Sequence, residues 1–569
     1  MQDDERRWWQ ETTIYQVYPR SFADSDGDGL GDLVGIIDHL DHLVDLGVGT
    51  VWLSPFFDSP QADFGYDISN YCDVAPEYGT LPDAERLIDE AHSRGLKVMF
   101  DMVMNHTSDQ HPWFRTSKAS RSNAKADWYI WRDGRGRGGR KPPNNWRSAM
   151  EVKTAWQWSP ERQQWYLASF LPFQPDLNFR NPEVKDAMFD AVRFWLRRGV
   201  DGFRLDIFGN VMKDPDFRDN PWRPHLDTGI PRFWERIYTE NTDDTIQFAK
   251  ELRAVADEFR SPDDPGGTER VLLGEVFGSA ETLRRYIGDD DGLHLVFLFD
   301  FLTYRYDAGF FRSRIEEYER NYPAPLQPTY VLENHDRSRL IDRVGGDVRK
   351  AQTLAVLLCT LRGVPAIYQG QEIAMSNTAM RLREARDPIA RTYFSWVPEA
   401  VVQRLPERLN RDEVRTPMQW TGGPNAGFTT PEAVPWLPVN ENHTERNVEA
   451  QDGVDGSMLE LYRALLHLRT ERPSLHRGSL TLRPADPAYP DVLVYERRFG
   501  DEPERTVVAV NFGSIAATVD LNERSRPIDG ATALPGSAEV EVLVATDRGL
   551  VLSGSTIQLP AHSAAVLSL

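Results

Sequence analysis

The sequence predicts an α/β protein built on a (β/α)8 TIM barrel, with a subdomain inserted after the third strand and a C-terminal antiparallel β-sandwich. Eight short apolar, β-branched runs alternate with amphipathic helical patterns, as in a barrel. Roughly 75 residues rich in Trp, Arg, Gly and Pro follow the third run, which is too long for a bare loop. After about residue 475, apolar and polar residues alternate, as in antiparallel sheets.

The barrel strands are predicted at residues 14–19, 50–55, 97–103, 202–207, 271–277, 294–301, 328–333 and 364–370. Their continuous apolarity indicates strands buried on both faces, in a parallel sheet that helices cover. Amphipathic stretches at 84–94 and 182–198 are such helices. The predicted domains are therefore a barrel of residues 1–103 and 179–475, an inserted subdomain of 104–178 and a C-terminal domain of 476–569.

Charge and composition narrow the classes of partner. The 569 residues include 65 Lys and Arg against 87 Asp and Glu, a net charge of −22. Such acidity argues against nucleic acid and anionic membranes as partners and favours a neutral substrate. No apolar run has the length of a membrane span, the N-terminus has no secretory signal pattern, and only Cys72 and Cys359 occur. We expect two reduced thiols in a cytoplasmic protein.

Polar clusters end four of the predicted strands: DMVMNH at 101–106, GFRLD at 202–206, GEV at 274–276 and ENHD at 333–336. Active sites of (β/α)8 barrels lie at the carboxyl ends of the strands. A single carboxylate at a strand end is often only a helix N-cap. Four clusters at four strand ends predict an active site.

These segments resemble the signature regions of glycoside hydrolase family 13, the α-amylase family, and most closely its oligo-1,6-glucosidase and α-glucosidase branch. The motifs that carry the resemblance run in order from residue 14 to about 440: IYQVYPRSF, DSDGDGLGDL, GYDIS, DMVMNHTSD, PPNNW, QPDLNF, GFRLD, LLGEV, ENHD, IYQGQEI, RTPMQW and PNAGFTT. The resemblance implies a retaining exo-α-glucosidase that releases terminal glucose from short oligosaccharides.

Retention at an α-glucosidic bond needs a carboxylate nucleophile and a carboxylic acid about 5–5.5 Å apart. The resemblance assigns the nucleophile to Asp206 in GFRLD and the acid/base to Glu275 in GEV. It assigns Asp336 in ENHD to the third acid, which binds sugar hydroxyls and stabilises the transition state. Arg204, two residues before the nucleophile, is expected to hold Asp206 ionised by a charge-assisted hydrogen bond.

The resemblance also implies residues that bind the terminal sugar. His106 and His335 are expected to donate hydrogen bonds to its hydroxyls, and Tyr66 to stack beneath its ring. Asp63 in DFGYD and Arg415 in RTPMQW are expected to pair across the pocket floor, which would close the pocket after one glucose. A surface ion pair is the alternative for these two.

Two residues of the neighbouring segment 173–178 are assigned separately. Phe173 is assigned to substrate binding. In QPDLN, which follows it, Asp176 is expected to be a structural partner near the inserted subdomain rather than a catalyst.

A metal loop is predicted where carboxylates alternate with glycines, and its expected ligands are Asp24, Asp26, Asp28, Leu30 through its carbonyl, and Asp32. An EF-hand is excluded, because the twelfth position is Gly35 instead of Glu. The matching loop of the family binds calcium, so we expect a structural Ca²⁺ and no organic cofactor. An Asx-rich turn without an ion is the alternative.

Linkage preference and acceptor are left open by the sequence. In these relatives Val after the nucleophile accompanies α-1,6 activity and Thr or Ala α-1,4 activity; here Ile207 resembles Val but is larger, which favours α-1,6 only weakly. A related transglucosylase or a sucrose or trehalose isomerase is an alternative. Another is a non-catalytic scaffold of the same fold, disfavoured because all three acids are present. The expected partner is a small oligosaccharide, with the chain as a monomer or homodimer.

Overall fold

The computed structural model describes residues 7–151, 153–227, 230–263, 266–398, 401, 409–500, 505–521 and 540–569. Eight parallel strands close into a barrel in the order β1-β15-β14-β13-β12-β9-β5-β2. They are β1 (Ile14–Val17), β2 (Thr50–Leu53), β5 (Lys97–Val103), β9 (Gly202–Asp206), β12 (Val271–Gly274), β13 (Leu295–Leu298), β14 (Thr329–Val331) and β15 (Val364–Tyr368). The predicted barrel is confirmed, and its strands match the eight predicted runs. Several end earlier than predicted, because the chain turns into loops or 3-10 helices at the carboxyl end.

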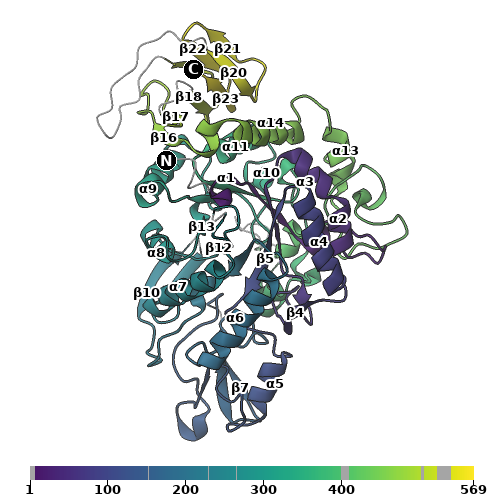
Figure 1. Cartoon of the computed structure of the whole chain (residues 1–569), viewed down its shortest axis with the longest axis vertical. Coiled ribbons are helices and arrows are strands. Elements are labelled where there is room, and N and C mark those ends of the chain that lie inside the picture. Colours follow the sequence, from purple (N-terminus) through teal and green to yellow (C-terminus); the bar gives the residue numbers. More distant parts are fainter. Residues whose placement is uncertain are drawn as a thin grey trace.

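Helices cover the outside of the barrel (Figure 1). They include α2 (Leu33–Asp38), α3 (Leu40–Leu46), α4 (Leu81–Ser93), α6 (Pro182–Leu196), α7 (Asp243–Asp257), α8 (Ala280–Ile287), α9 (Ala308–Asn321), α10 (Leu340–Arg343), α11 (Val348–Thr360) and α14 (Met458–Glu471). Local sequence explains where they begin. Thr80 and Asp83 form a capping box at α4, and the Asn181 side chain caps α6 with Pro182 in its first turn.

The barrel strands are apolar on both faces because each face packs in a different layer. Alternate residues point into the barrel, where Trp52, Met99, Leu273 and Phe297 belong to one buried cluster. The intervening residues point outward into the larger cluster shared with the helices; Leu272 is one of them. This explains the continuous hydrophobicity from which the strands were predicted.

Besides the short sheet of β3 (Phe57–Asp58) and β4 (Asn70–Val74), two excursions with strands leave the barrel in the described part of the chain. The first follows β5 and contains α5 (Pro112–Ala119) and a small sheet of β6 (Trp131–Arg132), β8 (Gln164–Leu167) and β7 (Trp156–Ser159). It lies at the bottom of Figure 1. The second follows β9 and is a hairpin of β10 (Trp222–Asp227) and β11 (Ile230–Trp234), which the sequence analysis did not predict.

The C-terminal residues form two antiparallel sheets, at the opposite end of the molecule from β7 (Figure 1). One contains β16 (Ser479–Leu482), β17 (Val492–Arg498), β18 (Arg505–Asn511), β23 (Ser563–Ser568) and β20 (Glu541–Ala545); the other contains β19 (Ala517–Asp520), β22 (Thr556–Leu559) and β21 (Val551–Ser553). Alternate residues of both sheets share one apolar cluster, including Val507 and Ile557. The sheets therefore pack face to face, as a sandwich does.

Both cysteines, Cys72 and Cys359, are free. Among the described residues, no helix combines the length and apolarity that crossing a bilayer requires.

Candidate active site

The predicted nucleophile, Asp206, and the predicted acid, Glu275, both accept hydrogen bonds from the guanidinium group of Arg204. Arg204 lies on β9, and the strand register places it beside Asp101 on β5 and Leu273 on β12. Its Nη1 donates to both oxygens of Asp101 at 2.9 Å and to Oδ1 of Asp206 at 2.7 Å, and its Nη2 donates to Oε2 of Glu275 at 2.5 Å. Three neighbouring strand ends thus bring three carboxyls to one cation. The predicted Arg204–Asp206 hydrogen bond is present, but it does not keep the pKa of Asp206 low as expected, because burial and the two neighbouring carboxyls outweigh it.

Charge in this cluster favours retention of a proton. Burial raises the pKa of Asp206 well above its usual range; Arg204 lowers it, whereas Glu275 and Asp101 raise it further by repulsion and a hydrogen bond from Glu275. Burial likewise raises the pKa of Asp101 to about 7, against the opposing effect of Arg204. Three carboxyls cannot all ionise cheaply around a single guanidinium, so the cluster holds a proton in the neutral range.

The turn after Asp206, the predicted nucleophile, is strained. Ile207 has a φ of 38° and a ψ of 41°, in the left-handed region that β-branched residues avoid. In this conformation its N–H donates to Oε2 of Glu275 at 3.1 Å. The turn therefore fixes the Glu275 carboxyl with a backbone donor, and such strain is characteristic of functional sites.

Asp336 lies in a second cluster, built on two arginines. Arg415 is fully buried and donates from Nη2 to Oδ1 of Asp336 at 2.6 Å; Arg411 donates to the same oxygen at 3.0 Å. Burial would raise the pKa of Asp336, but His335 and the two guanidinium groups outweigh burial and hold that pKa far below its usual range. Asp336 is therefore an ionised carboxylate, and its side chain is 30% exposed, so it can meet a ligand.

The predicted pairing of Asp63 with Arg415 is wrong, because the arginine that pairs with Asp63 is Arg411. Asp63 accepts from Nη2 of Arg411 at 3.3 Å, and the same nitrogen donates to Asp387 at 2.7 Å. Arg415 instead binds Asp336 and the carbonyl of His335. Both arginines belong to the loop after residue 409, and the path of that loop brings the first of them to Asp63.

Three of the predicted sugar-binding side chains touch one another. The Tyr66 ring stacks on His335, with centroids 5.6 Å apart and planes at 10°, and its hydroxyl lies 2.8 Å from Nε2. Nε2 of His106 lies 3.2 Å from the Tyr66 carbonyl. Burial lowers the pKa of His106 to about 4 and that of His335 to about 3. Both rings are therefore neutral and can each donate one N–H.

The end of the inserted segment also reaches this region. Gln174 donates to Oδ2 of Asp63 at 2.9 Å, and Phe173, which is half-buried, accepts from the Asp109 N–H at 2.8 Å through its carbonyl. Asp176 is fully buried and pairs with Lys213 at 2.6 Å. This is the structural partnership that we expected of Asp176.

The loop of Asp24 to Asp32 brings together only part of the predicted ligand set. Carboxylate oxygens of Asp24, Asp26 and Asp28 lie within 4.8 Å of one another. Each also accepts backbone N–H groups of the same loop, as in Asx turns. Asp32 belongs elsewhere, because its carboxylate caps α2 at Gly35 and binds Ser25. Asp24, Asp26 and Asp28 thus place three carboxylates close together, while in this structure the Asp32 carboxylate caps α2.

Two residues of the second cluster, Arg411 and Asp387, were not predicted from the sequence. Asp387 is fully buried, and its pKa lies below the usual range because Arg411 and hydrogen bonds outweigh its burial. Arg411 stands four residues before the Arg of RTPMQW, a spacing that could have marked it as a candidate. For Asp387 no local signal was present.

Fold and site define a barrel enzyme with carboxyl groups gathered at its strand ends. A model of the α-amylase catalytic domain matches residues 16–478, and the chain therefore belongs to the α-amylase family, glycoside hydrolase family 13. Its relatives place it in the α-glucosidase branch of that family.

Among the relatives, a protein named "Probable alpha-glucosidase" from Rhizobium meliloti (strain 1021) is 40% identical over 547 residues, covering 93% of this chain and 94% of that one. An oligo-1,6-glucosidase from Heyndrickxia coagulans is 36% identical over 541 residues, covering 90% and 93%. The solved structure of an α-glucosyl transfer enzyme, XgtA, matches with a TM-score of 0.85 at 37% identity and covers 99% of both chains. The chain is accordingly a glycoside hydrolase.

Proposed function

We propose that this enzyme is a retaining, exo-acting α-glucosidase that removes terminal non-reducing glucose from short oligosaccharides. The observation that carries the proposal is the pair of carboxyls, Asp206 and Glu275, held on the Arg204 guanidinium. Retaining hydrolysis requires one ionised and one protonated carboxyl side by side. A cluster with more carboxyls than cations supports a proton shared among them, and the proposal assigns that proton to Glu275 and the negative charge to Asp206.

In the proposed mechanism, the Asp206 carboxylate attacks the anomeric carbon while Glu275 protonates the leaving glycosidic oxygen. The bond to the leaving group breaks as a covalent glucosyl ester forms on Asp206. Glu275, now ionised, removes a proton from water, and the water oxygen displaces Asp206 to release glucose. Asp336 is proposed to bind sugar hydroxyls as a fixed carboxylate through both steps.

Exo action is proposed to depend on Asp63 and Arg411, which are hydrogen-bonded to each other and to Gln174 and Asp387. A buried network of this kind would end the pocket after one sugar. The test is a maltooligosaccharide blocked at its non-reducing end, digested beside the unblocked form. We expect glucose only from the unblocked form, and comparable cleavage of both would establish an endo-acting enzyme.

For the linkage we propose a preference for α-1,6 over α-1,4 bonds, because Ile207 is β-branched like the Val of α-1,6-specific relatives. Its left-handed turn directs its N–H to Glu275 and so couples its position to that of the acid. Initial rates on isomaltose, panose, maltose and maltotriose test this preference. Faster cleavage of maltose than of isomaltose would overturn it.

A second candidate function is glucosyl transfer to another sugar or alcohol. The likeness to an enzyme described as an α-glucosyl transfer enzyme supports it. Transfer and hydrolysis share the covalent intermediate and differ only in the acceptor. Product analysis at high maltose concentration separates them. Hydrolysis releases two glucose molecules for each maltose consumed, whereas transfer to maltose forms trisaccharides and releases less glucose than that.

We also propose a structural Ca²⁺ held by Asp24, Asp26 and Asp28, with the carbonyl of Leu30 as a further ligand. The closely spaced carboxylates support it. The ion would stabilise the loop and would take no part in the chemistry.

Finally, we propose a cytoplasmic enzyme that acts as a monomer or homodimer. The two free thiols support a reducing compartment.

A further inference from the structure

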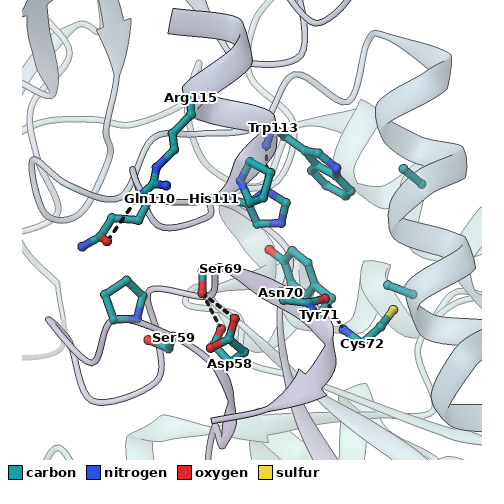
Figure 2. A pocket seen from close by; sticks show the side chains of 14 residues that line it. Asp58, Ser59, Ser69, Asn70, Tyr71, Cys72, Gln110, His111, Trp113 and Arg115 are labelled. Atoms are coloured by element: carbon teal, nitrogen blue, oxygen red, sulfur yellow. Dashed lines mark hydrogen bonds between the residues drawn. The ribbon is translucent and has the colours of Figure 1, made fainter. Parts of the chain in front are cut away.

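A cavity of about 640 Å³ lies outside the catalytic cluster, between the start of α5, α6 and a short sheet of β3 (Phe57–Asp58) and β4 (Asn70–Val74). Its volume falls within the range of roughly 300–1,000 Å³ that is usual for small-molecule sites. Figure 2 shows its lining, with the rings of Tyr71, His111 and Trp113 gathered together, Asp58 below and Gln110 and Arg115 on the other side.

On one side of the cavity, the rings of Tyr71, His111 and Trp113 pack against one another. His111 packs against Trp113 at 4.4 Å, and Tyr71 stacks on Trp113 at 6.1 Å and 28°. Tyr71 is held in turn by its hydroxyl, which donates to the carbonyls of Val103 and His106. Tyr71 and His111 are buried, while Trp113 is half-exposed. The Trp113 ring also meets Trp128 edge-on at 4.9 Å, and Nζ of Lys125 lies 5.8 Å from its centroid. The part of the ring that these neighbours leave exposed is open to a ligand with an apolar face.

Two polar residues of the lining offer unused hydrogen-bonding groups, Asn70 beside Tyr71 and Gln110 on the opposite side (Figure 2). The Asn70 oxygen accepts from the Cys72 N–H, and the Gln110 oxygen accepts from Arg115. In the described part of the chain, the amide nitrogens of Asn70 and Gln110 have no protein partner. Both residues are exposed, so these donors are available to a ligand.

The charges of the lining cancel. Asp58 and Arg115 are the charged residues among those that line the cavity, one of each sign. His111 adds no charge in the neutral range, because burial lowers its pKa to about 3. An anion such as a phosphate would need surplus positive charge, which this lining does not supply.

We propose that this cavity is a second sugar-binding site, which takes a neutral pyranose with its apolar face on Trp113 and its hydroxyls on the amides of Asn70 and Gln110. A pyranose joins an apolar face to a rim of hydroxyls, which is the combination that the lining presents. The proposal rests on the proposed function only for the choice of glucose as the probe.

The site backs onto the active site. The segment that contributes Ser59, Ser69 and Tyr71 to this cavity also carries Asp63 and Tyr66, and Tyr71 bonds to the backbone of His106. Glucose bound here would therefore rest against the loops that hold the predicted sugar-binding residues.

Cys72 lines the cavity and provides the test. It is partly exposed, whereas Cys359 is fully buried, so iodoacetamide reports on Cys72. Burial raises the pKa of Cys72, so the reaction is run at mildly alkaline pH and followed by intact mass. Near-saturating glucose should slow alkylation by about threefold or more, the protection expected from simple mass action. Sorbitol at equal concentration, which has hydroxyls but no ring face, should not.

Two variants locate the protection. Trp113→Ala should abolish it, and Gln110→Ala, an exposed change that leaves the Trp113–Trp128 packing intact, should weaken it. Both should keep kcat/KM for an aryl α-glucoside within about twofold. Equal alkylation rates in glucose and sorbitol, or protection that survives in both variants, would overturn the proposal. Protection of Cys72 by glucose in an inactive Asp206→Asn protein would support the second site independently of hydrolysis. If the enzyme hydrolyses α-glucosides but glucose does not protect Cys72, the second site is wrong and the proposed function stands.

Discussion

The two arginine-centred clusters at the carboxyl end of the barrel differ in their balance of charge. Arg204 faces three carboxyls alone, and the pKa values of Asp206 and Asp101 are raised, mainly by burial. Around Arg411 and Arg415, the pKa of Asp336 is lowered because three neighbouring groups outweigh burial. The first cluster keeps a proton, and the second keeps a fixed negative charge on Asp336.

The difference follows from where the cations come from. A barrel strand supplies one inward arginine among carboxyls of neighbouring strands, so negative charge is in excess. The loop after residue 409 supplies two arginines to the other cluster, where Asp63, Asp336 and Asp387 converge. Proton transfer suits the first arrangement, and holding a neutral sugar by its hydroxyls suits the second.

The largest effect is expected in the first cluster. Asp206→Asn keeps the shape but removes the nucleophile, so activity should fall by more than about a thousandfold. Circular dichroism should show an unchanged fold. In Asp206→Ala, azide should restore turnover and give a glucosyl azide of inverted configuration, because the small anion fills the vacated space. Substantial activity in Asp206→Asn would assign the nucleophile to another residue.

A smaller loss is expected in the second cluster. Arg411→Ala removes the shared donor of Asp63, Asp336 and Asp387; Asp336 keeps its pairing with Arg415, whereas the buried carboxylates of Asp63 and Asp387 lose their ion pair with Arg411. We expect kcat/KM to fall at least about a hundredfold, roughly 2.7 kcal/mol of transition-state stabilisation.

Arg415→Ala is the matched comparison, because Arg415 contacts Asp336 without pairing with Asp63. Both variants should lose activity, but only Arg411→Ala should also begin to cleave a substrate blocked at its non-reducing end. If Arg415→Ala alone opened the pocket in this way, the clamp would belong to Arg415 after all.

A pH effect on stability is expected at His106, which belongs to neither arginine-centred cluster. Burial lowers its pKa from 6.5 to about 4, so between these values the unfolded chain binds a proton that the native protein does not. Stability should therefore fall as pH drops through this window, by up to about 3 kcal/mol from this residue. The melting temperature should fall less between pH 7 and pH 4 for His106→Gln than for the unchanged protein. An equal fall of the melting temperature in both proteins would show that the His106 ring of the native protein is charged at acid pH.

The smallest effect is expected from chelation, which should touch neither cluster. If Ca²⁺ binds the Asp24 loop, a chelator should lower Tm by about 2–5 °C and leave kcat and its pH profile unchanged. Asp26→Asn, at an exposed position, should give the same shift and no further response to chelator. An unchanged Tm, with no metal found by elemental analysis, would mean an ion-free Asx turn.

The sequence by itself determined the barrel and its first cluster. Burial on both faces left eight continuous apolar runs, and carboxyl ends of parallel strands meet at one edge, so the convergence of Arg204, Asp206 and Glu275 followed from their places on strands. Strand periodicity is a local property that neighbouring residues express.

Tertiary structure alone decided the second cluster, the β10–β11 hairpin and the role of Asp32. Arg411 and Arg415 stand four residues apart, and only the folded path of their loop decides which guanidinium reaches Asp63. In the sequence, Asp32 fits the pattern of a metal ligand and that of a helix cap equally well. In the structure its carboxylate caps the start of α2. The pairing of Asp63 with Arg411 joins residues 348 positions apart, and no local pattern encodes which of two similar side chains closes that contact.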